Sequence, residues 1–196
     1  MTKFFKTLSA AALLVVSAAA LPAQETATEG TGTSDELSMG QPALQPGQPY
    51  AREQFGDWTI RCLNNPEGDD PCQLYQLLTD AEGNEVAEIN LFPLDGAGDA
   101  VAGANIVAPL GTFLTQGVTL SVDGGEARRY PFTFCNAGGC VARVGFTAAE
   151  VAQFKAGNSI AMSLVPYAAP DNRVDLTISL TGFTAAFDSG TPVQQQ

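Results

Sequence analysis

The stretch VTLSVDGGEARRYPF, residues 118–132, contains two short runs of alternating apolar and polar residues on either side of Asp123-Gly124. Alternation with a period of two is typical of strands that bury one face, and Asp-Gly between two such runs is a strong signal for a β-hairpin. The stretch therefore predicts a hairpin with strands at 118–122 and 127–132, within an antiparallel sheet.

Similar short runs occur on both sides of this hairpin and are separated by turn residues such as Glu82-Gly83-Asn84 and Pro170-Asp171-Asn172. Many short strands at this spacing favour an antiparallel β-sandwich, so the expected fold class is all-β. The further strands that we expect are 55–62, 72–78, 86–92, 104–108, 140–146, 159–166 and 173–180.

One segment departs from the strand pattern. Thr147 and Glu150 match a capping box, in which the two side chains satisfy backbone N–H groups at the start of a helix. Gly157 is a typical helix end. We therefore expect one short helix near 147–156, and the residues from Gly182 to Phe187 could form a final helical turn.

The N-terminus has the pattern of a secretory signal peptide. Lys3 and Lys6 precede an apolar run at 8–21, and small residues follow it. The run is shorter than the roughly 20 apolar residues that span a bilayer. We expect cleavage after residue 23, with a site after residue 20 as the alternative. We also expect a periplasmic or secreted location and no transmembrane helix in the cleaved chain.

The remaining chain divides by composition into three parts. Residues 24–52 are rich in Thr, Gly, Pro, Gln and Glu and contain few large apolar residues, which predicts a disordered leader. Residues 53–189 are long enough for one domain, the β-sandwich. Residues 190–196 resemble the leader and are expected to form a disordered tail.

The charge balance restricts the possible partners. The whole chain has a net charge of −12, and loss of the signal peptide removes two further lysines. An acidic chain without a basic face repels nucleic-acid backbones and anionic membrane surfaces. We therefore expect no nucleic-acid partner.

The four cysteines fall into two close pairs, Cys62 with Cys72 and Cys135 with Cys140. An even number of cysteines in an exported chain indicates disulfides, and three pairings are possible. We favour the two local pairs. The alternative is a zinc site with four thiolate ligands, but these spacings do not match the two-residue knuckles that such sites use.

The sequence contains no histidine, which excludes Ser-His-Asp, Cys-His and His-ligated metal chemistry. Paired carboxylates remain conceivable for a hydrolase, and Asp69, Asp70, Asp95 and Asp99 are the candidates. The segment 95–99 also bears a faint likeness to a calcium loop but lacks enough oxygen ligands. We expect no catalytic residue, no metal ion and no cofactor.

The connection 108–117 contains more apolar side chains than a surface loop needs. Leu110, Phe113 and Leu114 are expected to close the end of the core. The alternative is an exposed apolar patch, which would make these three residues a contact loop for another protein.

Taken in order, several segments resemble the invasion-associated locus B family of secreted proteins from α-proteobacteria. The resemblance runs from about Phe55 to Phe187. The residues that carry it are Trp58-x3-Cys62, Cys72-x-Leu74, Pro109-Leu110-Gly111-x2-Leu114-x2-Gly117-Val118-x-Leu120-x-Val122-Asp123-Gly124, Cys135-x3-Gly139-Cys140-x-Ala142, Lys155-x-Gly157 and Ser179-Leu180-x-Gly182-Phe183-x2-Ala186.

The resemblance implies an immunoglobulin-like β-sandwich that is exported to the periplasm or the outer envelope and has no established catalytic residue. The first hypothesis for function is a non-enzymatic interaction module with a protein partner in the envelope or outside the cell. The second is a small-molecule or lipid-binding sandwich that uses 108–117 as the mouth of a pocket. A hydrolase that uses carboxylates alone ranks last.

Overall fold

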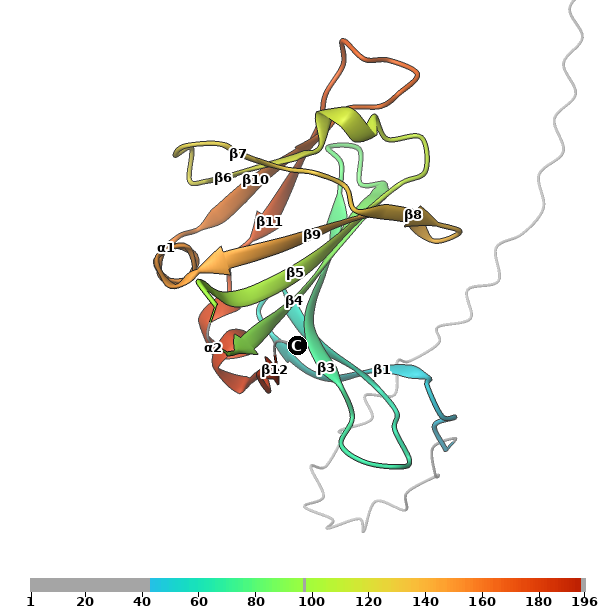
Figure 1. Ribbon diagram of the computed structural model, residues 1–196, viewed down its shortest axis with the longest axis vertical. Coiled ribbons are helices and arrows are strands. Elements are labelled where there is room, and N and C mark those ends of the chain that lie inside the picture. Colours follow the sequence, from blue (N-terminus) through green and yellow to red (C-terminus); the bar gives the residue numbers. More distant parts are fainter. Residues whose placement is uncertain (1–42, 97, 195–196) are drawn as a thin grey trace, which may run out of the picture. The chain divides into compact units, whose positions relative to one another are not determined.

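A computed structural model describes residues 43–96 and 98–194 of the chain. The expected signal peptide, 1–23, and most of the expected leader lie outside the described residues. The described part forms two mainly antiparallel β-sheets that pack face to face, with two short helices at one end (Figure 1).

The larger sheet begins with a five-strand antiparallel meander, to which two later strands are added in the order β1-β2-β3-β4-β5-β9-β8. The last strand, β12, pairs with the end of β4 in parallel. The strands are β1 (Pro49–Phe55), β2 (Trp58–Leu63), β3 (Cys72–Thr79), β4 (Glu85–Asp95), β5 (Ala100–Ala108), β8 (Phe134–Asn136), β9 (Gly139–Thr147) and β12 (Val193–Gln194).

The smaller sheet has the order β11-β10-β6-β7 and is antiparallel throughout. Its strands are β6 (Val118–Val122), β7 (Arg128–Tyr130), β10 (Ser159–Leu164) and β11 (Val174–Ser179). The expected all-β antiparallel sandwich is therefore confirmed. Its two-layer arrangement is immunoglobulin-like, although the first five strands follow one another as a simple meander.

The hairpin predicted around Asp123-Gly124 is present. Val118 pairs with Tyr130, and Leu120 pairs with Arg128. The Gly125 N–H donates to the Val122 carbonyl, and both central residues have positive φ, 45° at Asp123 and 74° at Gly124. Positive φ at both positions defines the turn that matches the twist of two antiparallel strands.

The folded region extends beyond its expected boundaries at both ends. The segment 55–62, expected as one strand, contains a tight turn at Gly56-Asp57, so that Phe55 pairs with Trp58. An additional strand, β1, therefore starts at Pro49, and the expected boundary at residue 53 is wrong. At the other end, β12 lies within the expected disordered tail and pairs with Leu94 and Asp95.

The predicted helix is α1 (Ala148–Ala156), which begins with the expected capping box. The Glu150 N–H donates to Thr147 Oγ1 at 3.3 Å, and the Thr147 N–H donates to the Glu150 carboxylate at 2.8 Å. A second helix, α2 (Phe183–Ser189), follows β11. A short 3₁₀ turn, η1 (Leu114–Gln116), precedes β6 at the opposite end of the sandwich (Figure 1).

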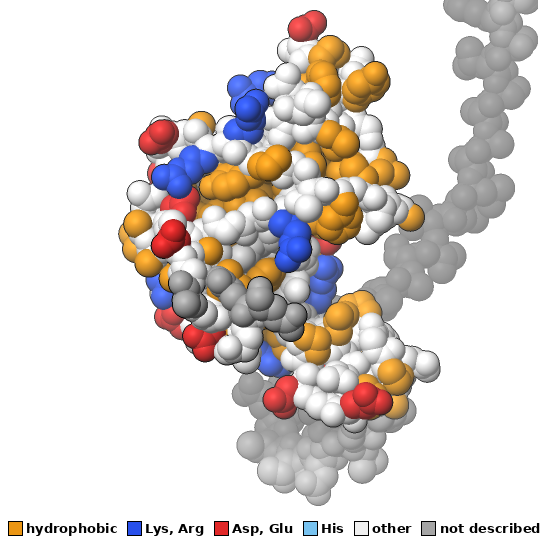
Figure 2. Space-filling view, in the orientation of Figure 1, with side chains coloured by type: hydrophobic (Ala, Val, Ile, Leu, Met, Phe, Trp, Pro, Cys, Tyr) orange, Lys and Arg blue, Asp and Glu red, His pale blue; other side chains and the backbone are white. Residues whose placement is uncertain are grey.

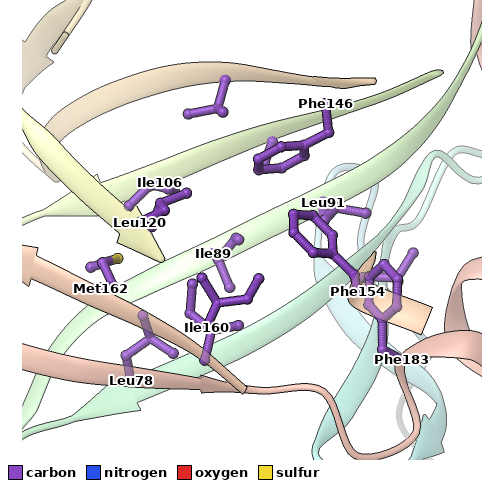
Figure 3. Close-up of a cluster of buried hydrophobic side chains, with 14 of the residues drawn as sticks. Leu78, Ile89, Leu91, Ile106, Leu120, Phe146, Phe154, Ile160, Met162 and Phe183 are labelled. Atoms are coloured by element: carbon purple, nitrogen blue, oxygen red, sulfur yellow. The ribbon is translucent and has the colours of Figure 1, made fainter. Parts of the chain in front are cut away.

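The core fills the space between the two sheets. Leu78, Ile89, Leu91 and Ile106 point into it from the larger sheet, and Leu120, Ile160 and Met162 point into it from the smaller sheet (Figure 3). A chain of edge-to-face aromatic contacts continues this core to the helices: Trp58 with Phe183, Phe183 with Phe154, and Phe154 with Phe146. Such contacts add to the stabilisation from burial alone.

Both expected disulfides are present. Cys62 on β2 is bonded to Cys72 on β3, and Cys135 on β8 is bonded to Cys140 on β9. Each bond joins residues that lie directly opposite one another in adjacent antiparallel strands. The zinc alternative is therefore wrong, because all four sulfurs are bonded in pairs.

Candidate functional site

The connection between β5 and β6 packs beside the loop between β10 and β11. The Phe113 N–H donates to the Val165 carbonyl at 2.7 Å, and the Tyr167 N–H donates to the Gly111 carbonyl at 2.8 Å. Thr112 is buried, and its hydroxyl donates to the Pro109 carbonyl at 2.8 Å. These bonds hold two loops far apart in sequence as one unit at the end of the sandwich.

The side chains of this unit point outward. Leu110 is 60% exposed, Leu114 is 45% exposed and Tyr167 is 71% exposed. Phe113 is half-buried and packs edge-on against Tyr167, with ring centroids 5.6 Å apart. We call Leu110, Phe113, Leu114 and Tyr167 the apolar end. The expectation that Leu110 and Leu114 close the core is therefore wrong, because the backbone pairing turns both side chains away from it.

Gly117 fixes the point at which this connection enters β6. Its φ is 67°, and a Cβ at this position would lie 2.5 Å from the Tyr130 carbonyl oxygen. Only glycine fits this close approach in a left-handed conformation. Figure 2 shows hydrophobic side chains gathered at this end of the molecule, over η1 and the loop between β10 and β11 of Figure 1.

The candidate carboxylates lie in two different turns. Asp70 accepts hydrogen bonds from the Tyr50 hydroxyl and from the Asn65 N–H, and these bonds lower the pKa of Asp70. It thereby ties the disulfide loop to β1. Asp69 is exposed in the same loop. A carboxylate with this environment stays ionised and serves as an acceptor, which is a structural role.

Asp95 and Asp99 lie at the turn between β4 and β5, where both are exposed. Asp95 accepts a hydrogen bond from the Gln194 amide at 3.0 Å. Within residues 43–96 and 98–194, no group of three or more His, Cys, Asp or Glu side chains is arranged to hold a metal ion.

The outer face of the larger sheet carries polar side chains that the sequence analysis did not single out. The Arg61 guanidinium donates to Asn90 Oδ1 at 2.8 Å and lies 3.7 Å from the centre of the Tyr75 ring. Glu88 accepts from Asn90 at 3.0 Å and pairs with Arg61 at 3.5 Å. Burial, followed by the Glu88 charge, raises the pKa of Tyr75. In the sequence, this cluster was indicated only by the polar positions that alternate with apolar ones along the predicted strands.

The row of outward-facing polar side chains continues across the sheet with Asn105 on β5 and Arg143 on β9, which lie directly opposite one another. Two surface hollows adjoin this pair. One hollow has a volume of about 640 Å³ and is bordered by Phe92, Leu94 and Val193. The other has a volume of about 450 Å³ and is bordered by Val107, Phe134 and Val141. Asn105 and Arg143 line both.

The fold and these surfaces define a class: a two-disulfide antiparallel β-sandwich with an exposed apolar end and a hollowed outer sheet face. The sequence model of the invasion associated locus B (IalB) protein family matches residues 58–190. The chain belongs to the IalB family, as the resemblance implied.

Two curated relatives are invasion protein B homologues from Brucella abortus, one from strain 2308 and one from biovar 1 strain 9-941. Each is 31% identical to this chain over 153 residues, which cover 78% of this chain and 86% of the relative. A solved structure, the invasion associated protein B of Bartonella henselae, has a TM-score of 0.57 at 25% identity. The match covers 68% of this chain and 90% of that one.

The two disulfides and the family point to an exported protein, because disulfides persist in oxidising compartments. Among the helices of the described region, none is long and apolar enough to cross a membrane.

Proposed function

We propose that this chain is a non-enzymatic binding protein of the periplasm or the cell exterior, and that its apolar end docks a protein partner. The observation that carries the proposal is that Leu110, Leu114 and Tyr167 are exposed on two loops whose backbones are hydrogen-bonded to one another. Exposed apolar patches of this kind mark contact sites, since burying them on a partner releases ordered water.

The charge around the apolar end favours a protein over a membrane. Segments 109–117 and 165–170 contain no charged residue, whereas the whole chain has a net charge of −12. An anionic membrane would repel the acidic remainder of the chain, whereas a protein with its own apolar patch would not. The partner lies in the envelope or outside the cell. The word invasion in the names of the relatives fits a partner on a host cell.

The positions of the aspartates support a non-enzymatic role. Asp70 is occupied by Tyr50 and Asn65, and Asp95 lies in a different turn. Hydrolysis with two carboxylates requires them to flank one bond.

Site-specific photo-crosslinking in the native host tests the proposal. A photoreactive residue at position 110, 114 or 167 should capture one and the same protein, and a photoreactive residue at Leu77 should not. Leu77 is the matched control because it is 40% exposed but lies in the larger sheet. The captured protein, once purified, should bind the Leu110→Ser/Leu114→Ser variant about tenfold more weakly than the unmodified chain, and the Leu77→Ser variant equally well. Equal capture from all four positions would refute the proposal.

A further inference from the structure

The outer face of the larger sheet is hollowed because two glycines lie opposite one another on it. Gly103 on β5 pairs with Gly145 on β9, and their neighbours on both strands point into the core. The Phe92 ring covers Gly103, since a Cβ there would lie 2.6 Å from the ring. Gly145 is exposed and leaves the floor of the hollow without a side chain.

One wall of this hollow is mainly apolar and the other is polar. Leu94 and Val193 border it at the end of β4, together with Gln194, whose amide donates to Asp95. Asn105 and Arg143, the next outward-facing pair of residues along β5 and β9, border it on the other side. Successive outward-facing residues of one strand are about 7 Å apart. The second hollow, beside Phe134, begins on the far side of these two polar residues. Figure 2 shows Lys or Arg side chains beside hydrophobic ones on this face.

Arg143 differs from the other arginines of the larger sheet. Arg61 is held by Asn90 and Glu88, and Arg52 donates to Cys72 Sγ. The Arg143 backbone N–H donates to Thr133 Oγ1, but its guanidinium has no hydrogen-bond or ion-pair partner within the described residues. An exposed guanidinium beside an amide provides a fork of donors suited to a carboxylate.

We infer that this face binds a small amphiphilic carboxylate. The carboxylate accepts hydrogen bonds from Arg143 and from the Asn105 amide, and the apolar part of the molecule lies over Gly145 against Leu94 and Val193. Because a single guanidinium serves this site in an acidic chain, a singly charged anion fits it better than a polyanion. This site is separate from the apolar end and does not depend on the proposed function.

Three probes distinguish binding of the carboxylate from binding of the apolar chain: decanoate below its micelle concentration, decanamide and acetate. The full exported chain, labelled with ¹⁵N, is titrated with each probe while backbone amide shifts are recorded. Decanoate should shift Gly103, Asn105, Arg143 and Gly145. Decanamide lacks the charge and acetate lacks the chain, so each should bind about tenfold more weakly or worse.

Arg143→Met should weaken decanoate binding by about tenfold or more and leave decanamide binding unchanged. Arg143→Lys keeps the charge but loses the forked arrangement of donors. Its affinity for decanoate should therefore lie between those of the unmodified chain and of Arg143→Met. Arg129→Met is the matched control, since Arg129 is an exposed arginine on β7 in the other sheet, and it should bind decanoate normally. The inference is overturned if decanoate shifts none of the four amides, if decanamide binds as tightly as decanoate, or if Arg143→Met and Arg129→Met bind alike.

Discussion

The side-chain amide of Gln76 binds both backbone groups of Ser179, 103 positions later in the chain. Gln76 Oε1 accepts from the Ser179 N–H at 2.7 Å, and Gln76 Nε2 donates to the Ser179 carbonyl at 3.1 Å. The indole N–H of Trp58 donates to the same carbonyl at 2.8 Å. Gln76 is 7% exposed. A buried amide on β3 thus extends hydrogen bonding from the larger sheet to the end of β11 in the smaller one.

Replacement of Gln76 by methionine, which has similar length, should lower the free energy of unfolding by about 2 kcal/mol or more, because backbone groups of Ser179 lose buried partners. Urea denaturation measures the loss. Gln153→Met, at an exposed position in α1, is the control and should change stability by less than about 0.5 kcal/mol. An equal, small effect at both positions would mean that the Gln76 bonds contribute nothing net.

The Asp123 carboxylate should make stability depend on pH. It accepts from the backbone N–H groups of Asn158 and Ser159, and these bonds lower its pKa from the ordinary value of 3.8. A depressed folded-state pKa stabilises the fold above the unfolded-state pKa, and this contribution declines as pH falls through the folded-state value.

Asp123→Asn keeps an acceptor oxygen and tolerates positive φ but does not titrate. It should therefore be less stable than the unmodified chain at pH 7, and the difference should shrink steadily below about pH 4. Urea denaturation from pH 7 to pH 2 tests this. A difference that stayed constant over this range would exclude a titrating contribution from Asp123.

The capping box of α1 should be worth about 1 kcal/mol. Thr147→Val removes the hydroxyl that accepts from the Glu150 N–H while keeping the shape of the side chain. Glu150 would keep its ion pair with Arg128 at 2.7 Å, so the fold should survive. Thermal denaturation measures the effect, with Thr115→Val in η1 as an exposed control that should leave stability unchanged.

The two disulfides should differ in their effect on stability. Closing loops of this size contributes about 2–3 kcal/mol each by chain entropy. Cys62 is fully buried in the core and Cys72 packs against it, whereas Cys135 is exposed at the edge strand β8 and Cys140, although buried, lies outside the core. Replacing both cysteines by alanine at 62 and 72 should therefore lower the free energy of unfolding more than the same replacement at 135 and 140, because it also removes packing from the core.

Urea denaturation of the two double variants gives the comparison. The denatured, unreduced chain should contain no titratable thiol. Equal losses in the two variants would show that burial of Cys62 adds nothing beyond loop closure.

Much of the fold followed from local signals. Alternation identified β6, the Asp123-Gly124 turn identified its partner β7, and Thr147 with Glu150 identified α1. The Gly56-Asp57 turn was not predicted, although Phe55 is out of phase with the alternating apolar residues Trp58 and Ile60 that follow it. The strands β8 and β12 are only three and two residues long, too short to carry a period.

The apolar end and the hollow beside Arg143 could not be predicted from the alternation of apolar and polar residues along the chain. The direction of Leu110 and Leu114 is set by backbone pairing with residues about 50 positions away, such as Val165. The hollow beside Arg143 arises from strand register, which brings Gly103 opposite Gly145. Long-range register of this kind could not be assigned from a single sequence, so the outer sheet face was not recognised.

The pairing of β12 with β4 has a practical consequence for handling the protein. Val193 and Gln194 form part of the wall beside Leu94, so a purification tag inserted directly after β12 would lie next to the hollowed sheet face. Deleting residues 193–194 would instead uncover backbone groups of Leu94 and Asp95 and create a new strand edge open to self-association. Recombinant chains should therefore retain β12 and carry any tag between the expected cleavage site after residue 23 and the start of β1 at Pro49.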